Sequence, residues 1–135
     1  MTNYATPSDT LKTTNHEIFM SYARLLRVVS LFPNGLTDLT EAHADPAILT
    51  AVIEILLADK GVEPKDYPRA DTYELSMKDG DAISEWGLAH AFDFFARKVE
   101  ATLQAAKAAG DKIKDVTERT EALTQSTLSS NGTSP

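Results

Sequence analysis

The chain has 135 residues, of which 20 are acidic and 13 basic, giving a formal net charge of −7, and it contains no cysteine. The length suits one domain with its own core, and the lack of cysteine excludes disulfides, a cysteine nucleophile and thiolate metal sites. There is no run of about 18 apolar residues that could span a membrane. The N-terminus also lacks the basic and apolar regions of a secretory signal, so we expect a cytoplasmic protein without membrane contact.

The acidic charge is concentrated in the middle of the sequence. Residues 38–93 hold 13 acidic and only four basic side chains, whereas residues 1–37 and 94–135 each carry a net charge of +1. Phosphate binding requires clustered Lys and Arg, so direct binding of nucleic acid is not expected. An acidic segment of this kind either attracts a basic protein surface or serves as a solvated, solubilising face.

The first helix is predicted from a capping pattern. Residues 1–13 are polar and indicate a flexible N-terminal arm, after which Thr14 and Glu17 form a capping box. A helix is therefore predicted over residues 15–32, ending before the Pro-Asn-Gly turn at 33–35. Its apolar residues recur at helical spacing: Ile18, Tyr22, Leu25, Val29 and Phe32.

A second helix is predicted over residues 46–59, because Asp45 is a favourable N-cap and Pro46 a favourable first helical residue. The segment before it, from residue 36, favours one short helical turn capped by Thr37. Residues 62–80 contain two prolines, which disfavour a helix early in this segment. We expect an extended loop across the helices, anchored by Tyr67, Tyr73 and Leu75.

The third predicted helix, residues 82–123 with Asp81 as N-cap, is much longer than the others. At 1.5 Å per residue it would reach about 63 Å, against about 27 Å and 21 Å for the first two. Its first part can complete a three-helix core, and the rest then has no partner within the chain. The sequence thus predicts an all-α fold, a small bundle of three principal helices with a long, projecting C-terminal helix. The predicted organisation is a flexible arm (1–13), a helical core (14–104), a helical extension (105–125) and a disordered polar tail (126–135).

Apolar residues follow a heptad spacing along this third helix. With Phe92 at position a, eight of the ten a and d positions are apolar: Phe92, Phe95, Val99, Ala106, Ala109, Ile113, Val116 and Leu123. This is a coiled-coil seam whose small central residues allow another helix to approach closely. Position g carries Lys98, Lys112 and Arg119, with no acids at position e to pair with them, so a partner with acidic flanks suits the seam better than a parallel dimer.

Gly110 leaves an alternative to the single long helix. Gly110 could end one helix and Asp111 could cap the next. The last helix would then fold back on the core and complete a four-helix bundle.

No catalytic, cofactor or metal site is predicted. The three histidines, His16, His43 and His90, lack the i, i+4 spacing of a helical metal site, and Glu41 and Asp45 beside His43 do not fix a metal geometry. The glycines are scattered, and no serine occupies a nucleophile elbow. The aromatic residues Trp86, Phe92, Phe94 and Phe95 have the helical spacing of a core, with Phe94 able to reach a further helix or a partner.

The sequence therefore favours a non-enzymatic structural or assembly protein, an oligomer or a subunit of a larger complex, that acts through its helical seam. Small acidic chains of this build occur among the virion and tail-assembly components of phages, so such a component is one expectation. The alternative is a small acidic inhibitor or antitoxin-like protein whose Asp66, Asp71 and Glu74 bind a basic, nucleic-acid-binding partner. An enzyme whose site follows no recognisable pattern is a third possibility.

Overall fold

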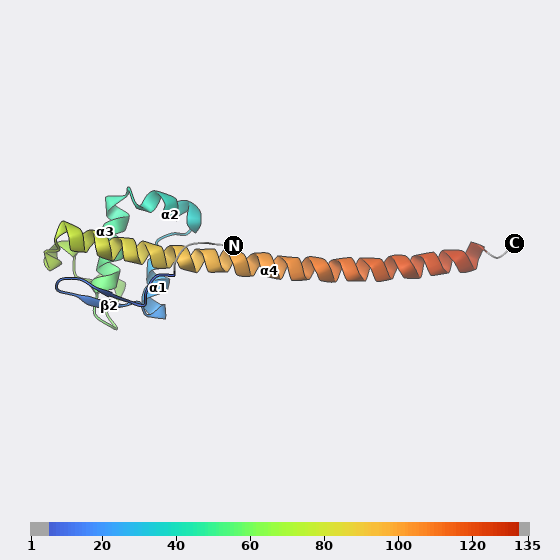
Figure 1. Cartoon of the computed structure of the whole chain (residues 1–135), viewed down its shortest axis with the longest axis horizontal. Helices are drawn as coiled ribbons and strands as arrows, with labels where there is room; N and C mark the ends of the chain where they lie inside the picture. Colours follow the sequence, from blue (N-terminus) through green and yellow to red (C-terminus); the bar gives the residue numbers. More distant parts are fainter. Residues whose placement is uncertain (1–5, 133–135) are drawn as a thin grey trace. The chain divides into compact units, whose positions relative to one another are not determined.

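The computed structural model describes the backbone of residues 6–132 and the side chains of residues 6–125. Within these residues the chain is mostly helical, as predicted, and also contains a small two-stranded sheet (Figure 1). The elements in chain order are β1 (Thr10–Lys12), β2 (Glu17–Phe19), α1 (Tyr22–Val29), α2 (Leu36–Ala42), α3 (Pro46–Leu57), the short 3-10 helices η1 (Pro64–Asp66) and η2 (Ala70–Tyr73), and α4 (Met77–Gly132). The chain divides into two compact units, unit 1 (Met1–Arg97) and unit 2 (Lys98–Pro135).

The sheet replaces the start of the first predicted helix. Strands β1 and β2 pair antiparallel with Leu11 opposite Ile18, and Thr13 closes the turn between them through hydrogen bonds to the backbone N–H and C=O of His16. Ile18 is buried while both of its neighbours in β2 are exposed, which is the period-two alternation of a strand. The predicted Thr14 capping box is therefore wrong, because this alternation buries Ile18 while the chain is extended.

The predicted flexible arm is also partly wrong. The Ser8 carbonyl oxygen accepts a hydrogen bond of 2.9 Å from the Trp86 indole, and Nε2 of His90 lies 2.8 Å from the same oxygen. The Asp9 carbonyl accepts a further bond from the backbone N–H of Met20. Residues 8–12 are thus held by the hairpin and by α4, and residues 1–5 lie outside the described part of the chain.

Helices α1 and α2 begin at residues other than those predicted. The Ser21 hydroxyl accepts a hydrogen bond of 3.2 Å from the backbone N–H of Arg24, so it caps α1. Gly35, with φ of 65°, occupies the N-cap position of α2 in place of Thr37. Glycine suits this position because other residues rarely adopt a positive φ.

Helix α3 begins where predicted and ends at Leu57, two residues early. The loop predicted over residues 62–80 is extended only in part, because it contains η1 and η2 and its last residues belong to α4. The Asp45 carboxylate accepts hydrogen bonds of 3.0 and 3.4 Å from two backbone N–H groups of the first turn of α3. In the loop, the Tyr67 hydroxyl lies 2.6 Å from a donating guanidinium nitrogen of Arg27. The Tyr73 hydroxyl donates to the last backbone carbonyl of α3 at 3.3 Å, and Leu75 packs against the core. These are the three anchors that the sequence indicated.

Helix α4 begins earlier than predicted and does not break. The Ser76 hydroxyl accepts a hydrogen bond of 3.1 Å from the backbone N–H of Asp79, so the helix starts at Met77 and Asp81 is not its cap. The helix continues through Gly110, so the alternative with a break and a second helix is wrong. A single glycine disfavours a helix by only about 1 kcal/mol, which the helix-forming residues around it outweigh.

At its C-terminal end, α4 is assigned up to Gly132, past the predicted start of the polar tail at residue 126. Residues 133–135 lie outside the described part of the chain.

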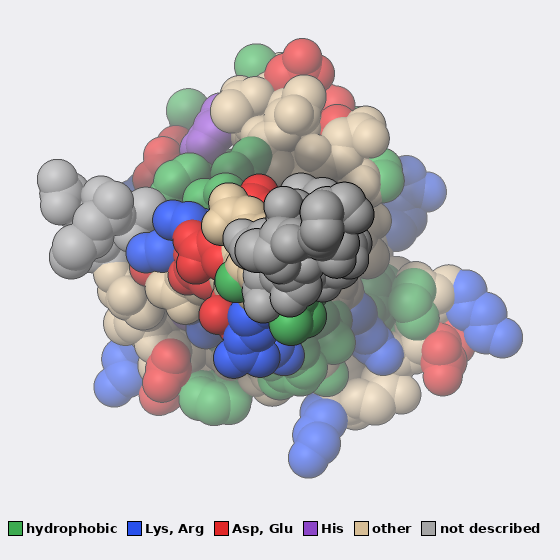
Figure 2. Space-filling model, turned by 90° about the vertical axis from the view of Figure 1, so that its right-hand side faces the viewer, with side chains coloured by type: hydrophobic (Ala, Val, Ile, Leu, Met, Phe, Trp, Pro, Cys, Tyr) green, Lys and Arg blue, Asp and Glu red, His purple; other side chains and the backbone are tan. Residues whose placement is uncertain are grey.

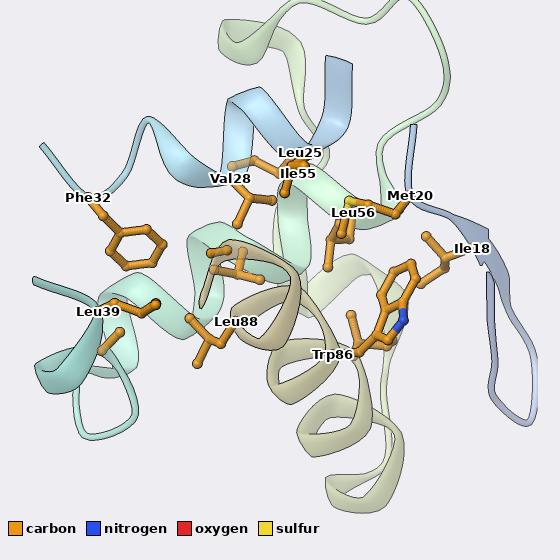
Figure 3. Close-up of a cluster of buried hydrophobic side chains, with 14 residues drawn as sticks. Ile18, Met20, Leu25, Val28, Phe32, Leu39, Ile55, Leu56, Trp86 and Leu88 are labelled. Atoms are coloured by element: carbon orange, nitrogen blue, oxygen red, sulfur yellow. The ribbon is translucent and has the colours of Figure 1, made fainter. Parts of the chain in front are cut away.

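The hydrophobic core is built within unit 1. Its buried members come from β2, α1, α2, α3 and α4 and the segments that join them, between residues 18 and 91. Figure 3 shows Trp86 of α4 beside Ile18 of β2. The largest fully buried side chains are Val28, Val52, Leu56, Ile83 and Leu88. Unit 1 thus has a core of its own.

Two glycines of α4 should respond oppositely to substitution by alanine. A Cβ on Gly87 would lie 2.7 Å from a methyl group of Val52 and 2.8 Å from one of Leu56, whereas a Cβ on Gly80 would meet nothing within 4 Å. We expect Gly87→Ala to lower the free energy of unfolding by about 1–3 kcal/mol through overpacking. Gly80→Ala should raise it by up to about 1 kcal/mol. Urea unfolding followed by the fluorescence of Trp86, the only tryptophan, measures both, and equal stabilities would contradict the close packing at Gly87.

Candidate functional site

Unit 2 exposes a row of large apolar side chains along one helix. Every residue from 97 to 125 is exposed, and Leu103 and Ile113 are 65% and 67% exposed. Side chains of this type are the ones that proteins normally bury. We call this row the α4 stripe and define it by Val99, Leu103, Ala106, Ala109, Ile113, Val116 and Leu123.

The α4 stripe keeps the predicted heptad spacing in a continuous helix. Val99, Ala106 and Ile113 are seven residues apart, as are Ala109 and Val116. A straight α-helix drifts by only about 20° per heptad from such a repeat, so the residues share one face over the length of the stripe. Leu103 lies at position e and widens this face. A face of this shape suits a second helix, which can place its own side chains between those of the stripe.

The centre of the α4 stripe carries small side chains. Ala106 and Ala109 occupy the seam, and Gly110 lies beside them on the same flank as Leu103. A Cβ added to Gly110 would meet nothing within 4 Å, so no packing within the described chain requires a glycine here. The small residues let the backbone of another helix approach closely.

Charges on unit 2 are balanced. Its five acidic and five basic side chains leave no net charge, whereas unit 1 carries the whole net charge of −7. Within unit 2, Arg119 and Asp115 form an ion pair along the helix at 3.2 Å. Both side chains are more than half exposed, so the pair contributes little to stability. Two copies of unit 2 therefore do not repel each other through net charge.

The first two residues of the predicted seam belong to unit 1. The ring of Phe95 meets Phe32 and Phe94 edge-to-face at centroid distances of 6.5 and 5.6 Å. Phe94 and Phe95 are partly buried against the core. Of the two contacts expected for Phe94, with a further helix or with a partner, the structure shows packing within unit 1. Phe92 is 40% exposed. Beyond Phe92, the exposed residues of the seam therefore lie in unit 2, within the α4 stripe.

The residues of the alternative acidic surface all lie on the loop before α4. Asp66 is in η1, Asp71 is in η2, and Glu74 follows η2 with a positive φ of 48°. All three are exposed, but Lys65 and Arg69 lie among them. Figure 2 likewise shows acidic and basic side chains interspersed on the face that it displays. These carboxylates therefore share their loop with positive charges that weaken attraction to a basic partner.

Tyr73 in this loop has a structural role. Burial raises the pKa of its hydroxyl above the ordinary value of 10.0, and the nearby carboxylates of Asp59 and Glu54 raise it further. The hydroxyl therefore stays protonated at neutral pH and keeps its hydrogen bond to the end of α3. The stability from this shift is present below pH 10 and is lost as the pH rises through the raised pKa.

A groove of about 370 Å³ lies between β2, α1 and the end of α3, and sequence reasoning did not find it. Two arginines line it, and both donate to backbone carbonyls across the fold. Arg24 donates to the carbonyls of Phe19 and Ala58 at 3.0 and 2.8 Å, and Arg27 donates to that of Val62 at 3.0 Å. These contacts join residues up to 35 positions apart, so no local sequence pattern predicts them. These hydrogen bonds brace the fold around the groove.

The three histidines have different surroundings. His90 is buried beside the Ser8 carbonyl and Trp86, and His43 is exposed. His16 meets the Tyr73 ring edge-on at 6.1 Å, and its Nδ1 is buried without a hydrogen-bond partner. Within the described residues no group of three or more His, Cys, Asp or Glu side chains is placed to hold a metal ion.

Comparisons of the chain with protein-family models, curated proteins and solved structures gave no match. Among the described residues, no helix is both long and apolar enough to cross a bilayer. Among the described side chains, the exposed apolar residues of the α4 stripe are the most distinctive set.

Proposed function

We propose that the protein is a non-enzymatic structural or assembly protein that associates through the α4 stripe, with copies of itself or with a larger complex. One observation carries this proposal. Four large aliphatic side chains, at positions 99, 103, 113 and 116, are exposed at 47%, 65%, 67% and 59% on a helix that continues without a break. Their spacing is that of a seam between helices.

Burial of the α4 stripe against another helix has a clear driving force. Removing a Val, Leu or Ile side chain from water contributes about 1.5–3 kcal/mol. Most of the stability of helices in proteins comes from packing an apolar face rather than from intrinsic propensity. Association would therefore stabilise both the contact and the helix that makes it.

The charge distribution supports unit 2 as the contact surface. Unit 1 carries a net charge of −7, so copies of unit 1 repel each other, whereas unit 2 is neutral. Contact between copies is thus favoured through unit 2. A place in a larger particle, such as a phage virion or tail-assembly component, and a cytoplasmic location stay predictions from the class of the chain.

The mass of the protein in solution tests the proposal. Light scattering after a sizing column is expected to give a defined oligomer for the full chain and a monomer for a chain that ends at Leu103. Circular dichroism of the shortened chain should still show the cooperative unfolding of unit 1. A full chain that is monomeric at every concentration would exclude self-association, and an oligomer that survives the truncation would exclude the α4 stripe as the contact.

A second candidate function is inhibition of a basic, nucleic-acid-binding protein, as in a small inhibitor or antitoxin-like protein. The exposure of Asp66, Asp71 and Glu74 on a single loop favours it. Reversing these three charges to Lys would then abolish capture of a basic partner from the native host, and rising salt would weaken that capture steeply. Capture that is insensitive to both changes would exclude this function, while the oligomer mass reports separately on the α4 stripe.

A further inference from the structure

We infer that the α4 stripe pairs with the α4 stripe of a second copy in antiparallel orientation, centred between Ala106 and Ala109, with Leu103 of each chain beside Gly110 of the other. The inference rests on the proposed function and specifies its partner and geometry. The self-complementary pattern of large and small residues carries it.

The layers of the seam pair well in this register. In an antiparallel pair of helices, position a of one chain faces position d of the other. Centring the pair between Ala106 and Ala109 places these alanines opposite each other and Val99 opposite Val116. Ile113 then faces Thr102. From Val99 to Val116 each large aliphatic residue of the seam thus meets a β-branched residue, while Leu123 faces Phe92, which is 40% exposed. The close approach falls at the centre, where both chains carry alanine.

Leu103 and Gly110, which lie outside the seam on one flank, also fit each other in this register. Glycine is among the least favourable residues within a helix, and nothing in the described chain fills the space beside Gly110. Leu103 is 65% exposed on the same flank. The antiparallel register brings the two residues together across the pair, so that the missing side chain of Gly110 makes room for Leu103.

A parallel pair lacks this complementarity. Position g of one chain would meet position e of the other, which places Leu103 beside Lys98 and Gly110 beside Ala105 of the second copy. The chain also enters the helix from unit 1, with its net charge of −7. A parallel pair brings two such segments to the same end of the interface, whereas an antiparallel pair keeps them at opposite ends.

The charges at position g oppose the antiparallel pair only weakly. Lys98 of one chain comes toward Arg119 of the second copy. Arg119 is already paired with Asp115 on its own helix at 3.2 Å, which offsets the repulsion.

Cysteine cross-linking separates the two orientations, because the chain contains no cysteine of its own. A disulfide forms only where two Cα atoms lie within about 7 Å. Val99→Cys and Val116→Cys chains are refolded together and oxidised, and a mixed disulfide between the two variants is expected. Each variant alone should form little disulfide, because the two like positions lie at opposite ends of the pair. Gln104→Cys, on the opposite face of the helix, is the control that should not cross-link.

A substitution and its rescue test the contact of Leu103 with Gly110. We expect Gly110→Leu to raise the helix content of the dilute monomer and yet to raise the dissociation constant of the pair at least tenfold. The swapped variant Leu103→Gly, Gly110→Leu should restore most of the affinity, since it recreates a leucine beside a glycine. In a parallel pair these residues never meet, so the swap would give no rescue.

The outcomes separate the inference from the proposed function. An oligomer whose single-cysteine variants each form their own disulfide, without a mixed one, overturns the antiparallel pairing and leaves association through the α4 stripe standing. A chain that is monomeric by light scattering and forms none of these disulfides overturns self-pairing altogether. Gly110→Leu that tightens association would also contradict the inference.

Discussion

Replacing Ile113 and Val116 together with Asp is expected to convert the associated protein into monomers. A dimer would lose four buried aliphatic side chains, each contributing about 1.5–3 kcal/mol, so the total loss is roughly 6–12 kcal/mol. The introduced carboxylates would also be taken out of water, which is unfavourable without a partner. Light scattering or sedimentation over a range of concentrations measures the result, and it should show no oligomer at concentrations where the parent chain is associated.

The matched control for this variant is Gln104→Asp with Gln125→Asp. It adds the same two negative charges to the same helix, but both positions lie on the face opposite the α4 stripe and are exposed. Association should be unchanged in the control. If both double variants dissociate equally, net charge rather than the apolar stripe governs association, and the proposed function loses its main support.

Unit 1 should not respond to either double variant. Its buried core lies between residues 18 and 91 and contains none of the substituted positions. Thermal unfolding of unit 1, followed by the fluorescence of Trp86, is therefore expected to match that of the parent chain under conditions where all are monomeric. A lowered midpoint would show that the substitutions act through folding.

The parts of the fold that the sequence predicted correctly are those with strong local signals. Asp45 and Pro46 set the start of α3, and its apolar residues are buried in the core or packed against it. Local capping and burial in the core therefore favour the same helix. The heptad spacing of α4 likewise depends only on residues within one helix. The ambiguity at Gly110 arose because a glycine shifts helix stability by only about 1 kcal/mol, too little to decide between a break and a continuous helix.

The N-terminal hairpin was missed because its support is distant in sequence. Thr14 and Glu17 form a locally valid capping pattern, and nothing in the neighbouring residues argues against it. The competing structure holds the Ser8 carbonyl on Trp86, 78 residues away, and buries Ile18 in the core. Long-range contacts of this kind override local propensity and cannot be read from a single sequence.

The candidate site likewise has parts that local spacing locates and parts that depend on distant contacts. The α4 stripe could be located from spacing, because an apolar periodicity that runs beyond the length of the other helices leaves apolar residues uncovered. The arginine-lined groove could not be identified, because Arg24 and Arg27 reach carbonyls about 35 residues away. Phe95 was assigned to the exposed seam because the sequence does not show that Phe32 meets it.

Trp86→Ala is expected to give the largest loss of folding stability, about 3–5 kcal/mol. The side chain is 8% exposed, and its indole N–H donates to the Ser8 carbonyl at 2.9 Å. Truncation therefore removes both a large buried surface and the contact that ties the N-terminal segment to α4. Urea unfolding followed by far-ultraviolet circular dichroism measures the change, since the only tryptophan is lost.

Trp86→Phe separates the two contributions. Phenylalanine keeps an aromatic ring in the core but cannot donate to the Ser8 carbonyl, which still has Nε2 of His90 at 2.8 Å. Because one neutral hydrogen bond contributes about 1 kcal/mol net, the loss should be much smaller than for Trp86→Ala. Equal losses would mean that the hydrogen bond, rather than the packing, holds the hairpin. If Trp86→Phe also associates with the same dissociation constant as the parent chain, then folding of unit 1 and association through the α4 stripe are separable properties of one chain.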